Sequence, residues 1–252
     1  MERIAIITGA TGGIGQKFIE KITLQEDIDC IWAVGRNSEK LRALAEKYDK
    51  VNPIETDLAG EGISLISDKL KSESPVVSIL INNAGTAYMG AFEKMESSKI
   101  EELCNINCSI PAMLIHTSLP YMTPGSRVIN ISSASSFQPN PYLSMYSASK
   151  AFLKNLSRAL SVELKPKNIF VTCVCPGWVD TGMLPRSKDG KEIKYPGMIS
   201  AERVVSKALK DSSSGKDMSV PGLFAKYFRL YSKITPTGLI MKQWVWGIRK
   251  YI

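Results

Sequence analysis

Tyr146 and Lys150 lie four residues apart in the stretch MYSASKAF, residues 145–152. On a helix, residues at this spacing share one face, so the phenol and the ammonium group would lie close together. A nearby positive charge favours the phenolate and lowers a phenol pKa that normally lies near 10. The pair therefore predicts a general acid or base that works near neutral pH. An exposed helical pair without any chemistry has the same spacing, so this pattern alone does not establish a function.

A glycine-rich segment, TGATGGIG at residues 8–15, lies between a predicted strand and a predicted helix. Its glycines Gly9, Gly13 and Gly15 permit a tight turn and let backbone N–H groups approach a phosphate at the helix N-terminus. This pattern predicts binding of the pyrophosphate of a dinucleotide. An ordinary glycine turn is the alternative interpretation.

The end of the second predicted strand indicates which nucleotide binds. In NAD-binding proteins an acidic residue about 20 residues after the glycines binds the ribose 2′-hydroxyl. Here the sequence reads Gly35–Arg36–Asn37, with no carboxylate. The guanidinium group of Arg36 would instead attract a 2′-phosphate, so we predict NADP(H) as the cofactor. A solvated surface arginine is the alternative.

Apolar, β-branched runs alternate with amphipathic segments along the first three quarters of the chain. This alternation predicts an α/β fold: one doubly wound Rossmann-type domain with about seven parallel strands and helices on both faces of the sheet. Strands are predicted over residues 3–8, 29–34, 51–57, 75–82, 126–132 and 168–176. Helices are predicted over residues 14–24, 37–48, 61–72 and 97–121, and around Tyr146.

The pattern changes twice after the sixth predicted strand. Charged, glycine and proline residues at 180–200 predict a mobile loop that contacts the substrate. Residues 222–252 are aromatic and basic and predict a C-terminal helical tail, so the catalytic domain would span residues 1–221.

The composition is that of an ordinary soluble protein, with 44% hydrophobic and 22% charged residues. No stretch reaches the roughly 18 apolar residues of a membrane-spanning helix, and the N-terminus lacks the pattern of a secretory leader, so we expect a cytoplasmic protein. The five cysteines have no disulfide-framework spacing, which favours buried, reduced thiols. The single histidine, His116, lies in an apolar helical segment, so we expect no metal site.

The net charge of +8 is concentrated at the C-terminus. Residues 222–252 hold six Lys or Arg residues and no Asp or Glu, whereas the first 221 residues hold 26 basic and 24 acidic residues. A nearly neutral body gives little support for nucleic-acid binding, and we expect none. The tail could make peripheral contact with an anionic membrane, or it could cover the pocket or a subunit interface.

Five motifs occur in one order along the chain: the glycine loop, NNAG at 82–85, NISS at 130–133, the Tyr146/Lys150 pair and PGWVDT at 176–181. Together they resemble the short-chain dehydrogenase/reductase family in its compact single-domain form. The resemblance covers residues 1 to about 181. It implies an oxidoreductase that acts on a small-molecule substrate with a nicotinamide cofactor and forms a homodimer or homotetramer.

The resemblance also implies roles for four catalytic residues. Tyr146 would give a proton to the substrate oxygen, or take it in the reverse direction, and Ser133 would hold and polarise that oxygen. Lys150 would bind the nicotinamide ribose and lower the pKa of Tyr146, while Asn107 would hold a water that links Lys150 to solvent. All four positions match the family pattern. This match disfavours the alternative of a catalytically silent NADP-binding regulatory or membrane-associated protein.

The cofactor site that the resemblance implies has three parts. The glycine loop would hold the pyrophosphate, the NNAG segment and Asp57 would lie near the adenosine, and PGWVDT would seat the nicotinamide ring. Besides Arg36, Tyr146 and Lys150, the residues of this site would be Thr8, Gly9, Thr11, Gly13, Ile14, Gly15, Asp57, Leu58, Asn83, Ala84, Gly85, Pro176, Gly177, Val179 and Thr181.

The expected substrate pocket is mostly apolar or aromatic, which favours a hydrophobic ketone or alcohol. Two stretches, VINISSASSFQPNP and VCPGWVDTGML, are loosely similar to hydroxysteroid dehydrogenases and 3-oxoacyl reductases, which implies a steroid-like or acyl-like substrate. Core packing is an alternative role for Tyr142 and Leu184. The candidate lining residues are Ser135, Phe137, Gln138, Tyr142, Trp178, Met183 and Leu184.

Overall fold

The computed structural model describes residues 1–182, 184, 187, 188 and 191–249. Its centre is a seven-stranded sheet in the order β11-β6-β5-β4-β1-β2-β3, in which every pairing is parallel. This confirms the predicted doubly wound fold. The strands are β1 (Arg3–Thr8), β2 (Cys30–Gly35), β3 (Val51–Glu55), β4 (Val76–Asn82), β5 (Arg127–Ile131), β6 (Phe170–Val174) and β11 (Met218–Ser219).

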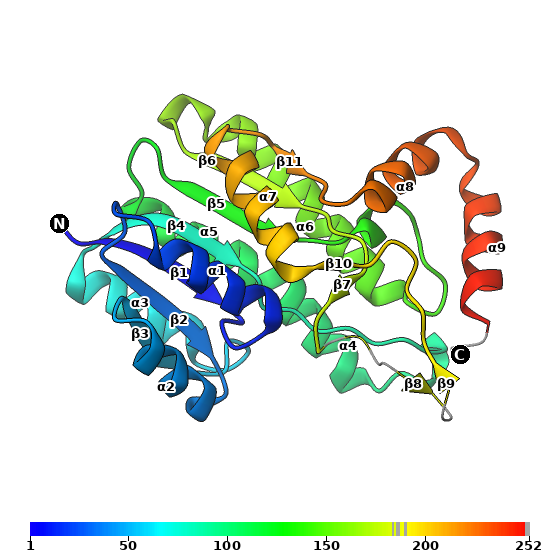
Figure 1. Ribbon diagram of the computed structural model, residues 1–252, viewed down its shortest axis with the longest axis horizontal. Helices are drawn as coiled ribbons and strands as arrows, with labels where there is room; N and C mark the ends of the chain where they lie inside the picture. The colour runs from blue at the N-terminus through cyan, green and yellow to red at the C-terminus, as the bar shows by residue number, and fades with distance from the viewer. Residues whose placement is uncertain (183, 185–186, 189–190, 250–252) are drawn as a thin grey trace.

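Helices cover both faces of the sheet (Figure 1). Successive residues of a strand point to opposite faces, so a parallel sheet buried on both sides needs apolar residues at nearly every position. In β1, Ala5 and Ile7 pack beneath α1, α2 and α7, while Ile4 and Ile6 pack beneath α3 and α5. These helices are α1 (Gly13–Thr23), α2 (Ser38–Lys47), α3 (Gly62–Glu73), α5 (Ile110–Ser118) and α7 (Ala201–Ser213).

The order of the strands reverses beside β1, because β1 pairs with β2 on one side and with β4 on the other. In open parallel sheets a ligand binds at such a switch point, beyond the carboxyl ends of the strands. The predicted site residues follow β1, β2, β4, β5 and β6, so the topology brings them to this edge.

The segment at residues 180–200, expected as a loop, contains short strands in the part that the structure describes. β7 (Val179–Asp180) pairs in parallel with β10 (Ile199–Ser200), and β8 (Ser187–Lys188) pairs with β9 (Lys191–Glu192) in an antiparallel ladder. The described residues of this segment therefore include two short ladders, and its mobility and its contact with the substrate stay predictions.

Two helices form the C-terminal tail, as its amphipathic pattern predicted. α8 (Leu223–Ile234) and α9 (Thr237–Ile248) are joined by Thr235 and Pro236. Figure 1 shows both helices at one end of the molecule, set outside the layers of the domain. Ala225 and Phe228 pack against the body beside β11 and thereby attach α8 to it.

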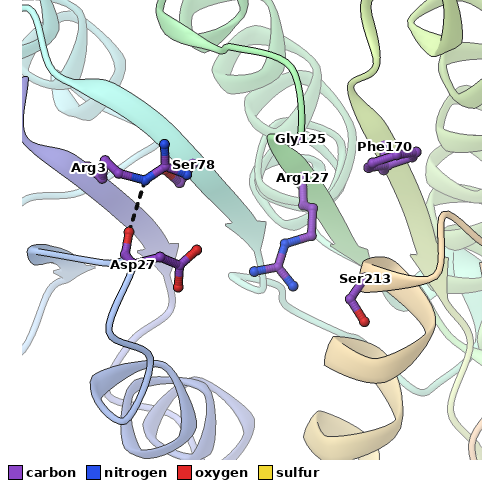
Figure 2. A pocket seen from close by; sticks show the side chains of 7 residues that line it. All are labelled: Arg3, Asp27, Ser78, Gly125, Arg127, Phe170 and Ser213. Atoms are coloured by element: carbon purple, nitrogen blue, oxygen red, sulfur yellow. Dashed lines mark hydrogen bonds between the residues drawn. The ribbon is translucent and has the colours of Figure 1, made fainter.

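A cavity of about 250 Å³ lies at the opposite, amino end of the strands (Figure 2). Its lining includes Arg3 and Arg127, the first residues of β1 and β5. Arg3 Nε donates to the carbonyl of Asp27 at 3.0 Å, and Arg127 Nη2 donates to Gln25 Oε1 at 3.2 Å. These contacts tie the loop before β2 to the starts of the strands. The remaining lining residues are Ser78, Gly125, Phe170 and Ser213.

Candidate active site

Tyr146 and Lys150 lie on consecutive turns of α6 (Ser144–Glu163), as their spacing predicted. The Lys150 Nζ atom is 5.6 Å from the centre of the Tyr146 ring. Lys150 is 4% exposed, and its Nζ donates to the carbonyl of Ile131 at 2.9 Å. That carbonyl ends β5, so α6 is anchored at the carboxyl edge of the sheet.

Burial shifts the pKa values of Tyr146 and Lys150 away from their ordinary values. It raises the pKa of Tyr146, although a hydrogen bond with Ser133 acts in the opposite direction. Burial also lowers the pKa of Lys150 to about 8. The expected lowering of the Tyr146 pKa is therefore wrong for this structure, because loss of water around the phenolate outweighs the favourable contacts. A phenol with a raised pKa stays protonated at neutral pH, which is the form that can donate a proton.

Ser133 lies directly beyond β5 and begins a short 3₁₀ helix, η4 (Ala134–Phe137). Its hydroxyl accepts a hydrogen bond from the Ser135 backbone N–H at 3.1 Å and interacts with the Tyr146 phenol. The adjacent Ser132 donates its hydroxyl to the Lys150 carbonyl at 2.7 Å. The two serines therefore connect the end of β5 to the helix that carries Tyr146.

Asn107 is fully buried in a π-helical turn, η2 (Asn105–Ser109). Its Oδ1 accepts from the Thr86 N–H at 3.0 Å, and its Nδ2 donates to the Thr86 carbonyl at 2.9 Å. The same Nδ2 donates to Ser149 Oγ at 3.0 Å. Asn107 thus connects the segment after β4 to α6, one residue before Lys150.

This π turn corrects the prediction of one continuous helix over residues 97–121. The chain forms α4 (Ser97–Cys104), then the π turn, then α5, and finally a 3₁₀ turn, η3 (Leu119–Tyr121). π turns inside helices occur frequently at functional sites, where the extra residue redirects a side chain.

The glycine loop has the close backbone approaches that a phosphate cradle requires. Gly9 has φ +61°, and a Cβ there would lie 2.9 Å from the Ala84 Cα. A Cβ on Gly15 would lie 2.3 Å from the Gly9 carbonyl oxygen. Neither position can accept a side chain without movement of the backbone. The first residues of α1 also have no side-chain cap, so their N–H groups suit an anion.

The loop is fastened to the end of β4 by two polar side chains. Asn83 Nδ2 donates to the carbonyls of Thr8 and Gly9, each at 3.0 Å. The Thr8 hydroxyl accepts from the N–H groups of Asn83 and Ala84 at 3.0 and 3.1 Å. The glycine loop and the NNAG motif therefore lie in direct contact, and the glycine loop fits a pyrophosphate at the N-terminus of α1.

The expected 2′-phosphate and adenine residues lie at the ends of neighbouring strands. Arg36 is exposed directly after β2, beside Gly35, where a Cβ would lie 3.5 Å from Thr11 Cγ2. Asp57 is exposed after β3, and its Oδ1 accepts from the Ala59 N–H at 3.0 Å, while Leu58 is buried. Arg36 and Asp57 thus follow the carboxyl ends of β2 and β3, which pair with each other in the sheet.

The PGWVDT segment follows β6, on the other side of β1 from Arg36 and Asp57. The Pro176 carbonyl accepts from the Ala134 N–H at 2.7 Å, and Val179 is paired with Ile199 in β10. Thr181 reaches the glycine loop, because a Cβ on Gly13 would lie 3.1 Å from its Cγ2 atom. Gly85 lies between Asn107 and Lys150, because a Cβ there would be 3.2 Å from Asn107 Oδ1 and 3.3 Å from Lys150 Nζ. Ile14 is partly buried against the core beneath α1.

The candidate substrate residues occupy different environments. The Trp178 ring lies 4.9 Å from that of Tyr195, and Tyr142 is exposed with φ +63°. Phe137 packs in the cluster that anchors α8, with Lys154 Nζ 5.8 Å from its ring. Ser135 and Leu184 are half-buried, and Gln138 is buried. Met183 lies outside the described residues.

Sequence reasoning missed three residues that position the site. Thr86 holds Asn107 through its backbone, Ser149 joins Asn107 to the Tyr146 carbonyl, and Tyr195 packs on Trp178. Only Ser149 has a recognisable sequence pattern. It lies three residues after Tyr146, and at this spacing on a helix a serine hydroxyl can donate to the backbone carbonyl of the earlier residue. Thr86 and Tyr195 carry no comparable pattern.

The described part of the chain contains no cluster of ligating side chains suited to a metal ion. The five cysteines are free, and the Sγ atoms of Cys173 and Cys175 lie 3.6 Å apart on one side of the chain at the end of β6. Cys104 is exposed, which corrects the expectation of uniformly buried thiols. Within the same residues, every helix is too short or too polar to traverse a bilayer.

Comparisons with known proteins show the family of the chain. Residues 3–192 match the family model described as short chain dehydrogenase. The chain is 31% identical over 261 residues to inactive hydroxysteroid dehydrogenase-like protein 1 of Homo sapiens, which covers 97% of this chain and 74% of that protein.

Two solved structures have the same fold. A short-chain dehydrogenase from Sphingobium yanoikuyae in complex with NADPH has a TM-score of 0.77 and 26% identity, covering 92% of this chain and 93% of that one. The bulky-bulky ketone specific alcohol dehydrogenase from Comamonas testosteroni has a TM-score of 0.75 and 26% identity, covering 91% and 90%. By its sequence motifs, its sheet topology and its match to the family model, this chain belongs to the short-chain dehydrogenase/reductase family.

Proposed function

We propose that the protein is an NADP(H)-dependent oxidoreductase that interconverts a carbonyl group and a secondary alcohol on a hydrophobic substrate. The observation that carries the proposal is the arrangement at the end of β5, where the Ser133 hydroxyl, the Tyr146 phenol and the buried Lys150 ammonium group meet. Two hydroxyl groups and one cation therefore lie at the carboxyl edge of the sheet, the edge at which the glycine loop follows β1.

NADP(H), when bound, supplies or accepts the hydride. Negative charge then develops on the carbonyl oxygen of the substrate, and Ser133 and Tyr146 donate hydrogen bonds to it. Donors fixed before the reaction stabilise the transition state more than the ground state. Tyr146 completes the reduction by transferring its proton to that oxygen.

The raised pKa of Tyr146 favours the reductive direction near neutral pH. Reduction needs the protonated phenol, which burial favours, whereas oxidation of an alcohol needs the phenolate. Reductive turnover should therefore persist across neutral pH, and oxidative turnover should rise as the pH increases. Thr86 and Ser149 hold the side chain of Asn107 in place, and we infer that Asn107 would hold a water that links Lys150 to solvent.

The NADP(H) preference rests on Arg36 at the end of β2, where no acidic residue occupies the position that binds a ribose 2′-hydroxyl. The similar structure from Sphingobium yanoikuyae contains NADPH, which supports this choice. Trp178, Tyr195 and Tyr142 support an apolar substrate, and the similar enzyme from Comamonas testosteroni acts on bulky-bulky ketones. Steroid-like ketones and 3-oxoacyl thioesters are the substrate classes that we propose.

A catalytically silent NADP-binding protein is the second candidate, because the similar human protein is named inactive. The two candidates are separated by NADPH oxidation measured against a panel of steroids, 3-oxoacyl thioesters, bulky ketones and simple aldehydes. The proposed enzyme oxidises NADPH with at least one class of the panel and does so faster than NADH. NADPH binding without turnover on any class would favour the silent protein.

We also propose that the chain is cytoplasmic and forms a homodimer or homotetramer. Met113 on α5 and Phe152 on α6 are large apolar side chains that are 48% and 44% exposed, and these two helices lie on the same side of the sheet. Such side chains would be covered in an assembly of identical subunits. Light scattering coupled to size-exclusion chromatography measures the assembled mass directly.

A further inference from the structure

One face of α8 is a row of large apolar side chains that the protein leaves uncovered. Leu223, Tyr227, Leu230 and Ile234 follow each other at helical spacing, and their exposed fractions are 77%, 63%, 61% and 74%. The opposite face of the helix, represented by Ala225, is buried against the body. α8 therefore has two apolar faces. One packs against the domain, and the other, formed by these four side chains, is exposed to solvent.

A row of cations runs beside this apolar row. Lys226, Arg229 and Lys233 recur at the same spacing, and together with Leu230 they enclose a groove of about 230 Å³. None of the three forms an ion pair with any residue that the structure describes. Residues 222–252 contain no Asp or Glu that could neutralise them.

α9 lies beside α8 and carries a further exposed aromatic side chain. The Tyr231 hydroxyl donates to Gln243 Oε1, and Trp244 Nε1 donates to the Pro141 carbonyl at 2.8 Å, so α9 is attached to both α8 and the body. Trp246, on the exposed side of α9, is 75% exposed. Tryptophan and tyrosine are the side chains enriched where an apolar phase meets water.

The surface adjoins the candidate active site. Phe224, the second residue of α8, lies against Gly177 of the PGWVDT segment and against Gly197. The Trp244 contact is to Pro141, directly before Tyr142. Figure 1 shows both helices at the end of the molecule where β7 and β10 lie, that is, at the carboxyl edge of the sheet.

We propose that α8 and α9 form a docking surface for an anionic phospholipid bilayer. The apolar row of Leu223, Tyr227, Leu230 and Ile234 would enter the boundary between headgroups and acyl chains, and the three cations would contact lipid phosphates. The positive charge of the helix is complementary to the anionic headgroups, and its exposed apolar side chains are complementary to the acyl chains. A second copy of the chain is a poorer occupant, because a two-fold contact would bring the same three cations of both copies together.

Docking would turn the carboxyl edge of the sheet, with the candidate active site, toward the lipid. An apolar substrate would then enter the site from the bilayer. This consequence rests on the proposed function, whereas the docking itself does not.

The test is co-sedimentation of the full-length protein with vesicles of phosphatidylcholine alone or of equal parts phosphatidylcholine and phosphatidylserine, at low salt. We expect binding to the mixed vesicles only. The variant K226Q/R229Q/K233Q should bind about a hundredfold more weakly, given the contribution of each cation near an anionic surface. L223S/L230S should also lose binding, because it removes apolar side chains and leaves the charge unchanged.

The matched control is K165Q/K167Q/K210Q, which removes three exposed charges from the opposite, amino end of the sheet. It should bind the mixed vesicles within about threefold of the wild type, because those lysines would not face the lipid. Equal losses in the two charge variants, or no binding by the wild type, would overturn the proposal. So would sedimentation equilibrium showing a dimer that L223S/L230S dissociates, with no vesicle binding.

Sedimentation is independent of catalysis, so its outcome and that of the oxidoreductase assay are separate. The variant Tyr146→Phe should bind vesicles like the wild type.

Discussion

Lys150 is a cation held in the interior next to Tyr146, and its position costs stability. Burial lowers its pKa from an ordinary 10.5 to about 8, which means that the folded protein holds this proton less tightly than the unfolded chain does. Such a group lowers the unfolding free energy while it is charged in the folded protein. This loss of stability becomes smaller as the pH rises from the folded pKa of about 8 toward the ordinary pKa of 10.5. A buried lysine with a lowered pKa beside the Tyr146 ring is typical of functional sites, which supports the proposed role of the pair.

The variant Lys150→Met tests this pKa directly. Between pH 7 and about pH 10 the wild type should gain about 2 kcal/mol of unfolding free energy relative to the variant, because the unfolded lysine still binds a proton that the folded lysine has lost. Chemical denaturation at several pH values measures the difference. Lys165→Met, at an exposed lysine, is the control and should show no such trend. A difference independent of pH would contradict the lowered pKa.

Arg36 carries the expected choice between the two nucleotides. Replacement by Ala should raise the KM for NADPH by roughly tenfold to a hundredfold, because a charge-assisted contact to the 2′-phosphate contributes about 1.5–3 kcal/mol. The KM for NADH should change little. Arg203→Ala, at an exposed arginine on α7, is the control and should leave both constants unchanged. Equal effects of Arg36→Ala on the two nucleotides would remove the basis of the NADP(H) assignment.

At the scale of elements, the turn between β1 and α1 positions the nucleotide. Gly15→Ala would place a methyl group 2.3 Å from the Gly9 carbonyl oxygen, so the backbone of the loop must move. We expect a loss of about 1–3 kcal/mol in stability, together with loss of NADPH binding. Thermal unfolding and fluorescence titration measure the two effects.

Gly238→Ala is the matched control, because Gly238 is also near the start of a helix and a Cβ there meets nothing within 4 Å. This control should unfold at or slightly above the wild-type temperature, since alanine favours a helix more than glycine does. Wild-type NADPH affinity in Gly15→Ala would show that the close contact does not shape the cradle.

The elements that the sequence could predict are those with a strong local pattern. Five of the first six strands, β1, β2, β4, β5 and β6, are rich in apolar, mostly β-branched residues, whereas β3 (VNPIE) buries only Val51 and Ile54. The spacing of Tyr146 and Lys150 placed both residues on α6. β11 was not located in advance, because a two-residue strand, Met218–Ser219, has no pattern of its own. The π turn at Asn107 was missed because residues 97–121 keep a helical composition throughout.

The chemistry of the site was only partly predictable, for a related reason. Burial depends on which segments pack around a side chain, and this determines the pKa of Tyr146. The contacts of Thr86 with Asn107 and of Tyr195 with Trp178 likewise join segments far apart in the sequence. Only Ser149, three residues from Tyr146, belonged to a local pattern.

At the scale of the whole molecule, NADPH should stabilise the folded protein, because its expected binding residues follow five different strands of the sheet. NADPH at about a hundredfold excess over its Kd should raise the unfolding free energy by about 2.7 kcal/mol, if it binds only the folded protein. For a chain of this size this corresponds to a rise of roughly 5–10 °C in Tm. NADH at the same concentration should give a clearly smaller rise. Equal rises with the two nucleotides would contradict the proposed specificity.

The most direct test of the proposed reaction is the variant Tyr146→Phe, with any ketone that the wild type reduces. It removes one hydroxyl and keeps the ring, so NADPH affinity and Tm should stay close to those of the wild type. The turnover number for NADPH oxidation should fall by a factor of about a hundred to ten thousand, the usual contribution of a general acid. A turnover number near that of the wild type, with NADPH binding intact, would show that Tyr146 is not the proton donor.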